Sequence, residues 1–256
     1  MIFLRTIVAF LLFSNFLFSQ ESKIKTEEAQ PETILFIGNS YLYYGDSLHN
    51  HFRRMVEEYF TGYDASSVKS ATIGGSRLKH HNVERLIKPK AISSIEKFDL
   101  VILQGGSGET LTVDSRKEFS YFVKKHIQTI RENNSQAALY MTHAYVKPHK
   151  KFTENQIKTI AETYTKVGIE NQTLVIPVGL AFDLAYQKQP SIVLHKFDGS
   201  HPSLLGTYLA ACTVFSSIYG ESPIGLKYDY FGTINEKDKM FLQEIAEKAT
   251  SMFFNK

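Results

Sequence analysis

The feature that most constrains the fold of this chain is a short apolar run ending in a turn, Ile34-Leu35-Phe36-Ile37-Gly38-Asn39-Ser40-Tyr41. Four consecutive β-branched, aliphatic and aromatic residues predict a strand that is buried on both faces. Gly38 then permits a sharp turn. A helix is expected soon after, because apolar residues recur along one stripe: Leu48, Phe52, Val56 and Phe60.

Strands and helices alternate along the rest of the chain. Further strands are predicted at residues 67–73, 98–103, 137–142 and 174–178. Residues 76–97 suggest a loop plus a helix, and longer helices are predicted at 113–133, after a Thr153 cap, from Pro202 to Tyr219 and at 236–254. This alternation predicts an α/β protein whose parallel sheet is covered by helices on both faces, as a three-layer α/β/α sandwich.

The N-terminal segment has the pattern of a secretory signal peptide. Arg5 is followed by an apolar run from Thr6 to Phe18, which is short for a membrane span, and then by polar residues. We predict a signal peptide at 1–20, a linker at 21–32 and one domain at 33–256. No cysteine follows the apolar run, so no lipid anchor is expected. The predicted location is therefore periplasmic or extracellular, without a stable membrane anchor after cleavage.

Composition argues against several classes of function. The formal net charge is +3 in 256 residues, and no basic stripe is interleaved with aromatic residues, so nucleic acid is not an expected partner. The single cysteine, Cys212, lies in an apolar run and is predicted to be a buried thiol. Neither a disulfide framework nor zinc spacing is present, and we expect no metal and no cofactor.

Small and polar residues follow the predicted strands, where one edge of the sheet should collect them. Ser40 follows the first strand beside a helix N-terminus, whose free N–H groups suit a developing oxyanion. Near the C-terminus, Asp198 and His201 are three residues apart. A histidine there can take the proton of a serine hydroxyl, and the carboxylate can orient its ring. The alternatives are helix-capping roles for Ser40 and Asp198 and an incidental surface histidine.

Taken in chain order, these motifs resemble the SGNH (GDSL-type) hydrolase family, in its bacterial exported branch. Gly38-Asn39-Ser40 is similar to the family's first block, whose serine is the nucleophile. Gly75, in the Gly74-Gly75 pair, matches the glycine block that helps form the oxyanion hole. Asp198 and His201 match the final block, which supplies the orienting acid and the general base. The resemblance implies a flavodoxin-like sheet and a serine esterase without cofactor.

One block departs from the family pattern. The third block normally provides an asparagine whose side chain donates to the oxyanion, but here Leu103 is followed by Gln104-Gly105-Gly106-Ser107. Gln104 carries the same amide on a longer stem, so we predict that Gln104 joins the amides of Ser40 and Gly75 in the oxyanion hole, with Ser107 as the alternative. Asn39, Tyr41 and His143 are expected to contact the substrate.

Three functions compete at this point. A serine esterase uses Ser40, His201 and Asp198 as a triad. A nucleotide-binding protein is disfavoured, since no glycine-rich phosphate loop follows a strand. A non-catalytic carbohydrate-binding relative should have lost part of the triad, and all three positions are filled. An α/β-hydrolase is excluded because Leu42 occupies the position of the second glycine of its serine motif.

The predicted loops around Ser40 bear on the substrate. They are polar rather than apolar: Ser76, Arg77, His80, His81, His143, Tyr145, Lys147 and His149. A long acyl chain needs a continuous apolar groove, because each buried CH₂ contributes only about 0.8 kcal/mol. We therefore predict a short-chain ester as substrate, and specifically an O-acetyl group on a carbohydrate. A lysophospholipid or another small carboxylic ester is the alternative.

Overall fold

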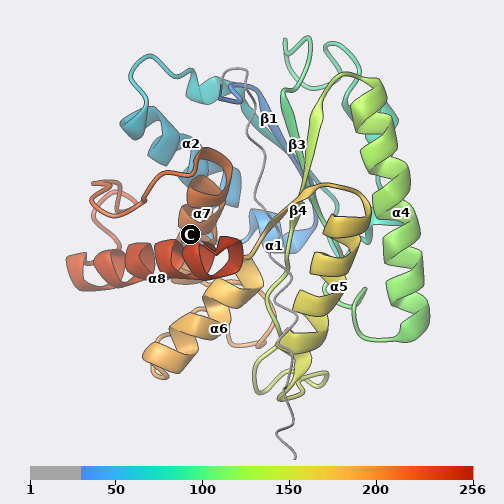
Figure 1. Ribbon diagram of the computed structural model, residues 1–256. Helices are drawn as coiled ribbons and strands as arrows, with labels where there is room; N and C mark the ends of the chain where they lie inside the picture. Colours follow the sequence, from blue (N-terminus) through green and yellow to red (C-terminus); the bar gives the residue numbers. More distant parts are fainter. Residues whose placement is uncertain (1–29, 256) are drawn as a thin grey trace, which may run out of the picture.

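A five-stranded parallel sheet forms the centre of the molecule (Figure 1). The computed structural model describes residues 30–255, so the predicted signal peptide and most of the linker lie outside the described residues. The strands run in the order β2-β1-β3-β4-β5, which is the flavodoxin-like order that the resemblance implied. Their bounds are β1 (Ile34–Gly38), β2 (Val68–Thr72), β3 (Leu100–Gln104), β4 (Gln136–Tyr140) and β5 (Leu174–Ile176).

Helices cover both faces of this sheet, so the predicted three-layer α/β/α sandwich is confirmed. One face packs against α2 (Leu48–Tyr59), α6 (Val178–Lys188), α7 (Leu204–Tyr219) and α8 (Glu236–Phe254). The other face packs against α3 (Val83–Leu86), α4 (Val113–Glu132) and α5 (Gln156–Glu170), which lie on the opposite side in Figure 1. Alternate residues of each strand point to opposite layers, which is why β1 is apolar throughout. Within residues 30–255, no helix is both long and apolar enough to span a bilayer.

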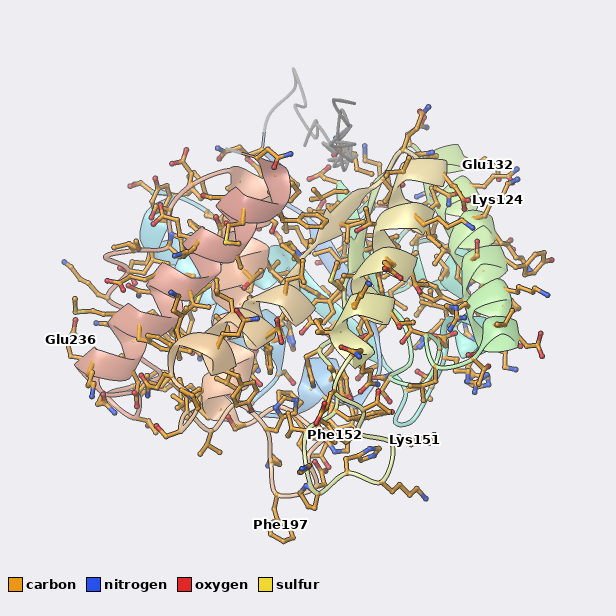
Figure 2. The ribbon with its side chains drawn as sticks, turned by 60° about the horizontal axis from the view of Figure 1, so that its bottom comes forward. Lys124, Glu132, Lys151, Phe152, Phe197 and Glu236 are labelled. Carbon is orange, nitrogen blue, oxygen red and sulfur yellow. The ribbon has the colours of Figure 1, made fainter. Side chains whose placement is uncertain are left out.

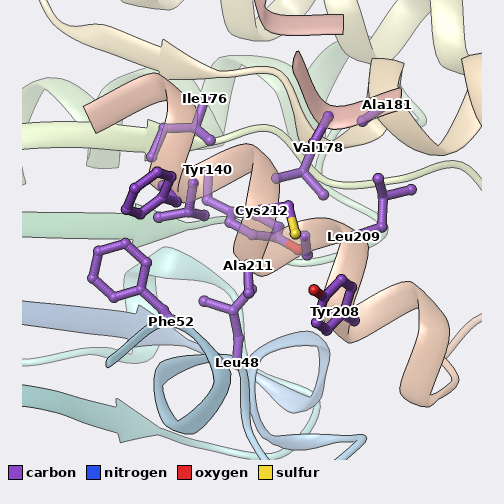
Figure 3. Packing of buried hydrophobic residues seen from close by; sticks show 14 of the residues in the cluster. Leu48, Phe52, Tyr140, Ile176, Val178, Ala181, Tyr208, Leu209, Ala211 and Cys212 are labelled. Carbon is purple, nitrogen blue, oxygen red and sulfur yellow. The ribbon is translucent and has the colours of Figure 1, made fainter. Parts of the chain in front are cut away.

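Helix α7 lies at the centre of the first layer. Every residue from Gly206 to Ser216 is buried, because α2, α6 and α8 surround the helix as well as the sheet. Figure 3 shows Cys212, Tyr208 and Leu209 of this helix packed among side chains of the strands and of α2. Cys212 is fully buried, as predicted. Full burial of a large apolar side chain contributes roughly 1.5–3 kcal/mol, so this layer is a major source of stability.

Several helices and strands begin or end at residues other than those predicted. The last strand ends at Ile176, and Val178 begins α6, a helix that the sequence reading missed because its apolar residues extend the strand pattern. Helix α5 begins at Gln156 rather than after Thr153. Pro202 does not start α7; it pairs with His195 in an isolated bridge, and the hydroxyl of Ser203 caps the helix instead.

The chain order places β1 and β3 side by side at a switch point. The connection that leaves β1 covers one face of the sheet, whereas α4, which follows β3, covers the other. Open α/β sheets bind ligands outside the carboxyl ends of the strands at such a point. The carboxyl ends of β1 and β3 carry the Gly38-Asn39-Ser40 turn and Gln104, so the fold brings the first and third predicted blocks together.

Candidate active site

Ser40 is held in place by the turn that precedes it. Asn39 caps α1 (Ser40–Tyr43): its Oδ1 accepts the N–H of Tyr41 at 3.0 Å. Ser40 is therefore the first residue of a short helix, directly after β1, with 8% of its surface exposed. Helix-start N–H groups lack intrahelical acceptors, so the Ser40 amide stays available for a ligand oxygen.

The three predicted triad residues are hydrogen-bonded in one line. Nε2 of His201 lies 2.9 Å from Oγ of Ser40, and Nδ1 of His201 lies 2.5 Å from Oδ2 of Asp198. An ionised carboxylate only accepts, so Nδ1 carries the hydrogen and Nε2 can accept the Ser40 proton. The structure therefore places within hydrogen-bond distance the three residues that the sequence predicts as nucleophile, base and acid.

Asp198 is kept ionised by the hydrogen bonds it receives. Its Oδ1 accepts the amides of Ser200 and His201 at 2.8 and 2.9 Å. Burial alone would raise the pKa of Asp198, but hydrogen bonds from the His201 ring and from these two amides lower it to about 2. The carboxylate can thus stabilise a positive imidazolium across the whole neutral pH range.

Gln104 lies where the family's third block would place its amide, but the side chain is already engaged. Its Oε1 accepts the N–H of Asn39 at 2.8 Å, and its Nε2 donates to the carbonyl of Gly105. A primary amide has two N–H groups, so one donor is left for an oxyanion. Gln104 therefore also fixes the turn that carries the nucleophile. A side chain on Gly38 would clash with it, since a Cβ there would lie 2.3 Å from Oε1.

The predicted glycine block lies in the turn that follows β2. Gly75 has φ +67 in the exposed turn after β2, and its amide donates to no acceptor among residues 30–255. The neighbouring Ser76 is tied down: its carbonyl accepts Nδ2 of Asn39 at 3.0 Å. Ser107, the alternative donor, lies near Tyr41 and Tyr145, where it opposes the rise of their pKa values that burial causes.

The three residues predicted to contact the substrate lie at buried positions. Asn39, Tyr41 and His143 are buried, with 2–3% of their surface exposed, so they lie behind the triad rather than on its open side. Polar side chains suggest exposed positions, so the sequence did not reveal this burial. It is possible because each side chain has a hydrogen-bond partner inside the protein. Tyr41 and His143 contact Ser200 of the triad loop.

The expected polar rim is also thinner than predicted. Ser76 and His81 are buried as a pair, with Oγ 2.8 Å from Nε2, and Tyr145 is 4% exposed. Tyr44, which the sequence did not single out, stacks on the ring of His201 with centroids 4.0 Å apart. Nothing in the local sequence distinguishes this tyrosine from Tyr43; only the fold brings it to the histidine.

Two loops beside the triad carry a cluster of positive charge. Val146 donates to the carbonyl of Gly199, which joins the loop after β4 to the loop that carries Asp198. Figure 2 shows Lys151, Phe152 and Phe197 together at this end of the molecule. The cationic rim is the name we give to the surface formed by four exposed lysines: Lys147, Lys150, Lys151 and Lys196. None of these lysines forms an ion pair with any described residue.

The described residues, 30–255, contain no group of three or more His, Cys, Asp or Glu side chains that could hold a metal ion. The hydrogen-bonded line of Ser40, His201 and Asp198 is an arrangement that can carry out acyl transfer with protein groups.

The proteins to which this chain is similar were found among solved structures. No protein-family model matches the sequence, and no curated protein matches it. Among solved structures, a DUF4886 family protein from Bacteroides uniformis has a TM-score of 0.66 at 19% identity, over 87% of this chain and 95% of that one. A candidate SGNH hydrolase from Slackia heliotrinireducens has a TM-score of 0.56 at 22% identity, over 72% of this chain and 97% of that one.

This chain has the fold of the SGNH hydrolases. An acetyl xylan esterase is also similar, with a TM-score of 0.53 and 18% identity, over 73% of this chain and 99% of that one. The SGNH fold accounts for the position of each block: the nucleophile turn follows β1, the glycine turn follows β2, and the acid and base precede α7.

Proposed function

We propose that this protein is a serine esterase that hydrolyses carboxylic esters through an acyl-enzyme on Ser40. The observation that carries the proposal is the unbroken line of hydrogen bonds from Ser40 through His201 to Asp198 at the carboxyl edge of the sheet. A non-catalytic relative would have no need to keep this geometry. The SGNH fold of the chain is consistent with the same chemistry.

In the first half of the reaction, Oγ of Ser40 attacks the ester carbonyl while Nε2 of His201 takes its proton. The negative charge that develops on the carbonyl oxygen is stabilised by the amides of Ser40 and Gly75 and by Nε2 of Gln104. His201 then gives the proton to the leaving alcohol. In the second half, His201 takes a proton from the water that attacks the acyl-enzyme. It then returns the proton to Oγ of Ser40 as the bond to the acyl group breaks and the acid is released.

For the substrate, we propose a short acyl group, an O-acetyl, on a carbohydrate, and one that carries negative charge. The cationic rim supports this choice, because its unpaired lysines can attract carboxylates next to the triad. Phe197, 93% exposed in that rim, offers a ring for the apolar face of a sugar. One similar solved structure is an acetyl xylan esterase. Lysophospholipid hydrolysis remains the runner-up, since an exposed phenylalanine beside lysines also suits an anionic lipid surface.

An acyl-chain series on aryl esters separates these substrates. We expect the fastest turnover with acetate and a steady fall toward octanoate. Acetate release should then be measured from a neutral acetylated xylan and from an acetylated polyuronate, at low and high salt. Lys196→Ala should raise KM several-fold for the polyuronate alone, whereas Lys237→Ala on α8 should leave KM unchanged for both substrates. A rate that rises with chain length would favour the lipid ester instead.

We further propose that the protein is exported, on the basis of the signal-like residues 1–20. The mature chain should begin near residues 20–22. Mass spectrometry of the protein recovered from the periplasm or medium measures this directly, and an intact N-terminus in the cytoplasm would contradict it.

A further inference from the structure

Ser200, between the acid and the base, is held at three separate atoms. Its amide donates to Oδ1 of Asp198 at 2.8 Å. Its carbonyl lies 2.8 Å from Nε2 of His143, and its hydroxyl lies 3.0 Å from the hydroxyl of Tyr41. Ser200 thus anchors the loop that carries Asp198 and His201, although it takes no part in the proposed reaction.

His143 can make its contact with Ser200 only when Nε2 is the donor. A carbonyl oxygen accepts, so Nε2 must carry the hydrogen, and Nδ1 has no partner among residues 30–255. The ring is stacked between Tyr41, 4.1 Å away between centroids, and Phe182 of α6, 4.4 Å away. Burial between these rings keeps the pKa of His143 well below its ordinary value, so the ring stays a neutral donor.

These contacts join the nucleophile to the base behind the triad. Ser40 and Tyr41 are consecutive in α1, and Ser200 and His201 are consecutive in the loop. The pair Ser40–His201 is 2.9 Å apart and the pair Tyr41–Ser200 is 3.0 Å apart, so the two segments meet at two neighbouring points. His143 stacks on one of these segments and donates to the other.

The loop needs such an anchor because its outer side is open. Phe197 is 93% exposed, and the side chain of Asp198 is 47% exposed. A displacement of about 1 Å in a catalytic group can lower a rate by roughly 10²-fold. We infer that His143 is a positioning residue, whose N–H to the Ser200 carbonyl holds the general base in line with the nucleophile. The inference rests on the proposed esterase function.

Two substitutions of His143 separate the hydrogen bond from the packing. His143→Phe keeps a ring between Tyr41 and Phe182 but removes the donor. His143→Gln provides an N–H donor of similar reach. We expect His143→Phe to lower kcat by roughly 10- to 100-fold with KM within two-fold, because the base is misplaced while the substrate surface is intact. His143→Gln should recover most of the loss.

A matched control is His126→Phe, since His126 of α4 is also buried and its Nε2 also contacts a backbone carbonyl, that of Leu78, at 3.0 Å. This variant should retain wild-type kcat, even with a comparable loss of thermal stability. Tyr41→Phe, which removes only the hydroxyl toward Ser200, should give a smaller fall in kcat and serves as the test if His143→Phe does not fold.

The outcomes distinguish this inference from the proposed function. If the folded His143→Phe protein keeps the wild-type kcat, or if His143→Gln is as slow as His143→Phe, the positioning role is wrong although the enzyme is an esterase. Unchanged kcat in Tyr41→Phe would overturn the inference where His143→Phe is unfolded. If the wild-type protein hydrolyses no ester and Ser40 takes up no fluorophosphonate, the esterase proposal itself fails.

Discussion

At the scale of single residues, Ser40 and His201 act as a unit in the proposed reaction, because neither can form the acyl-enzyme without the other. We expect Ser40→Ala and His201→Ala each to lower kcat/KM by about 10³-fold or more. Asp198→Asn should be less harmful, since it spares the nucleophile and the base. Covalent labelling by a fluorophosphonate, read by mass spectrometry, is the direct measurement, and a label on a serine other than Ser40 would refute the assignment.

Gln104 has two separable tasks, and two variants can tell them apart. Gln104→Ala removes both the acceptor for Asn39 and the amide donor. Gln104→Glu keeps an acceptor for the Asn39 amide but removes the donor. If the amide donates to the oxyanion, both variants should lower kcat by roughly 10²- to 10³-fold with little change in KM.

The same kinetic measurement reveals the alternative. Near-normal kcat in Gln104→Glu together with a large loss in Gln104→Ala would mean that Gln104 only fixes the nucleophile turn. Ser107→Ala serves as the companion variant, because Ser107 was the other candidate donor. A large loss of kcat in Ser107→Ala would assign the oxyanion role to the hydroxyl of Ser107.

At the scale of elements, the triad loop depends on Gly199, which packs against the loop after β4. Gly199 has φ +68, and a Cβ there would lie 2.2 Å from the carbonyl oxygen of Val146. We expect Gly199→Ala to destabilise the protein by about 2 kcal/mol or more, since left-handed strain and a backbone clash add, and to lower kcat by displacing Asp198 and His201.

Gly232 provides the matched control for this prediction. It has φ +77, but a Cβ there would meet nothing within 4 Å. Gly232→Ala should therefore show only the cost of the left-handed backbone, about 1–2 kcal/mol, and normal activity. Urea unfolding and esterase assays of both variants make the comparison, and equal behaviour of the two would contradict the packing argument.

At the scale of the whole molecule, buried histidines should make the fold sensitive to acid. Burial lowers the pKa values of His49, His81 and His195 to about 4, from an ordinary 6.5. Between these pH values the unfolded chain binds protons that the folded chain does not, so the free energy of unfolding falls as the pH falls. Each histidine contributes at most about 1.4 kcal/mol per pH unit in this window.

Glu109 opposes this trend, and so does Asp183, whose pKa is also raised by burial. Burial raises the pKa of Glu109 to about 7 from 4.5, so it favours the folded state as the pH falls through that range. The three histidines outweigh these two carboxyls, and the urea midpoint should therefore decline steadily from about pH 6.5 toward pH 4. His81→Gln removes one titrating group and should make the decline shallower. A midpoint that is constant or rises in acid would disprove the prediction.

The fold was largely readable from local pattern. Apolar runs of strand length alternate with amphipathic stripes of helical spacing, and both periods depend only on neighbouring residues. The candidate triad residues could be selected as well, because Gly38-Asn39-Ser40 and Asp198-x-x-His201 are short motifs whose chemistry lies within a few residues. Helix α6 was missed for the same reason: its early apolar residues continue the pattern of β5.

From the sequence one therefore predicts the order of strands and helices along the chain, and Ser40, His201 and Asp198 as the candidate nucleophile, base and acid. Only the tertiary structure decided which polar side chains face the solvent. His143 and Tyr41 were predicted to contact the substrate, and the fold buries both side chains, where they hold Ser200. Tyr44 reaches His201 only because two distant segments meet. Burial and such contacts depend on residues that are far apart in the chain, so the local sequence pattern does not predict them.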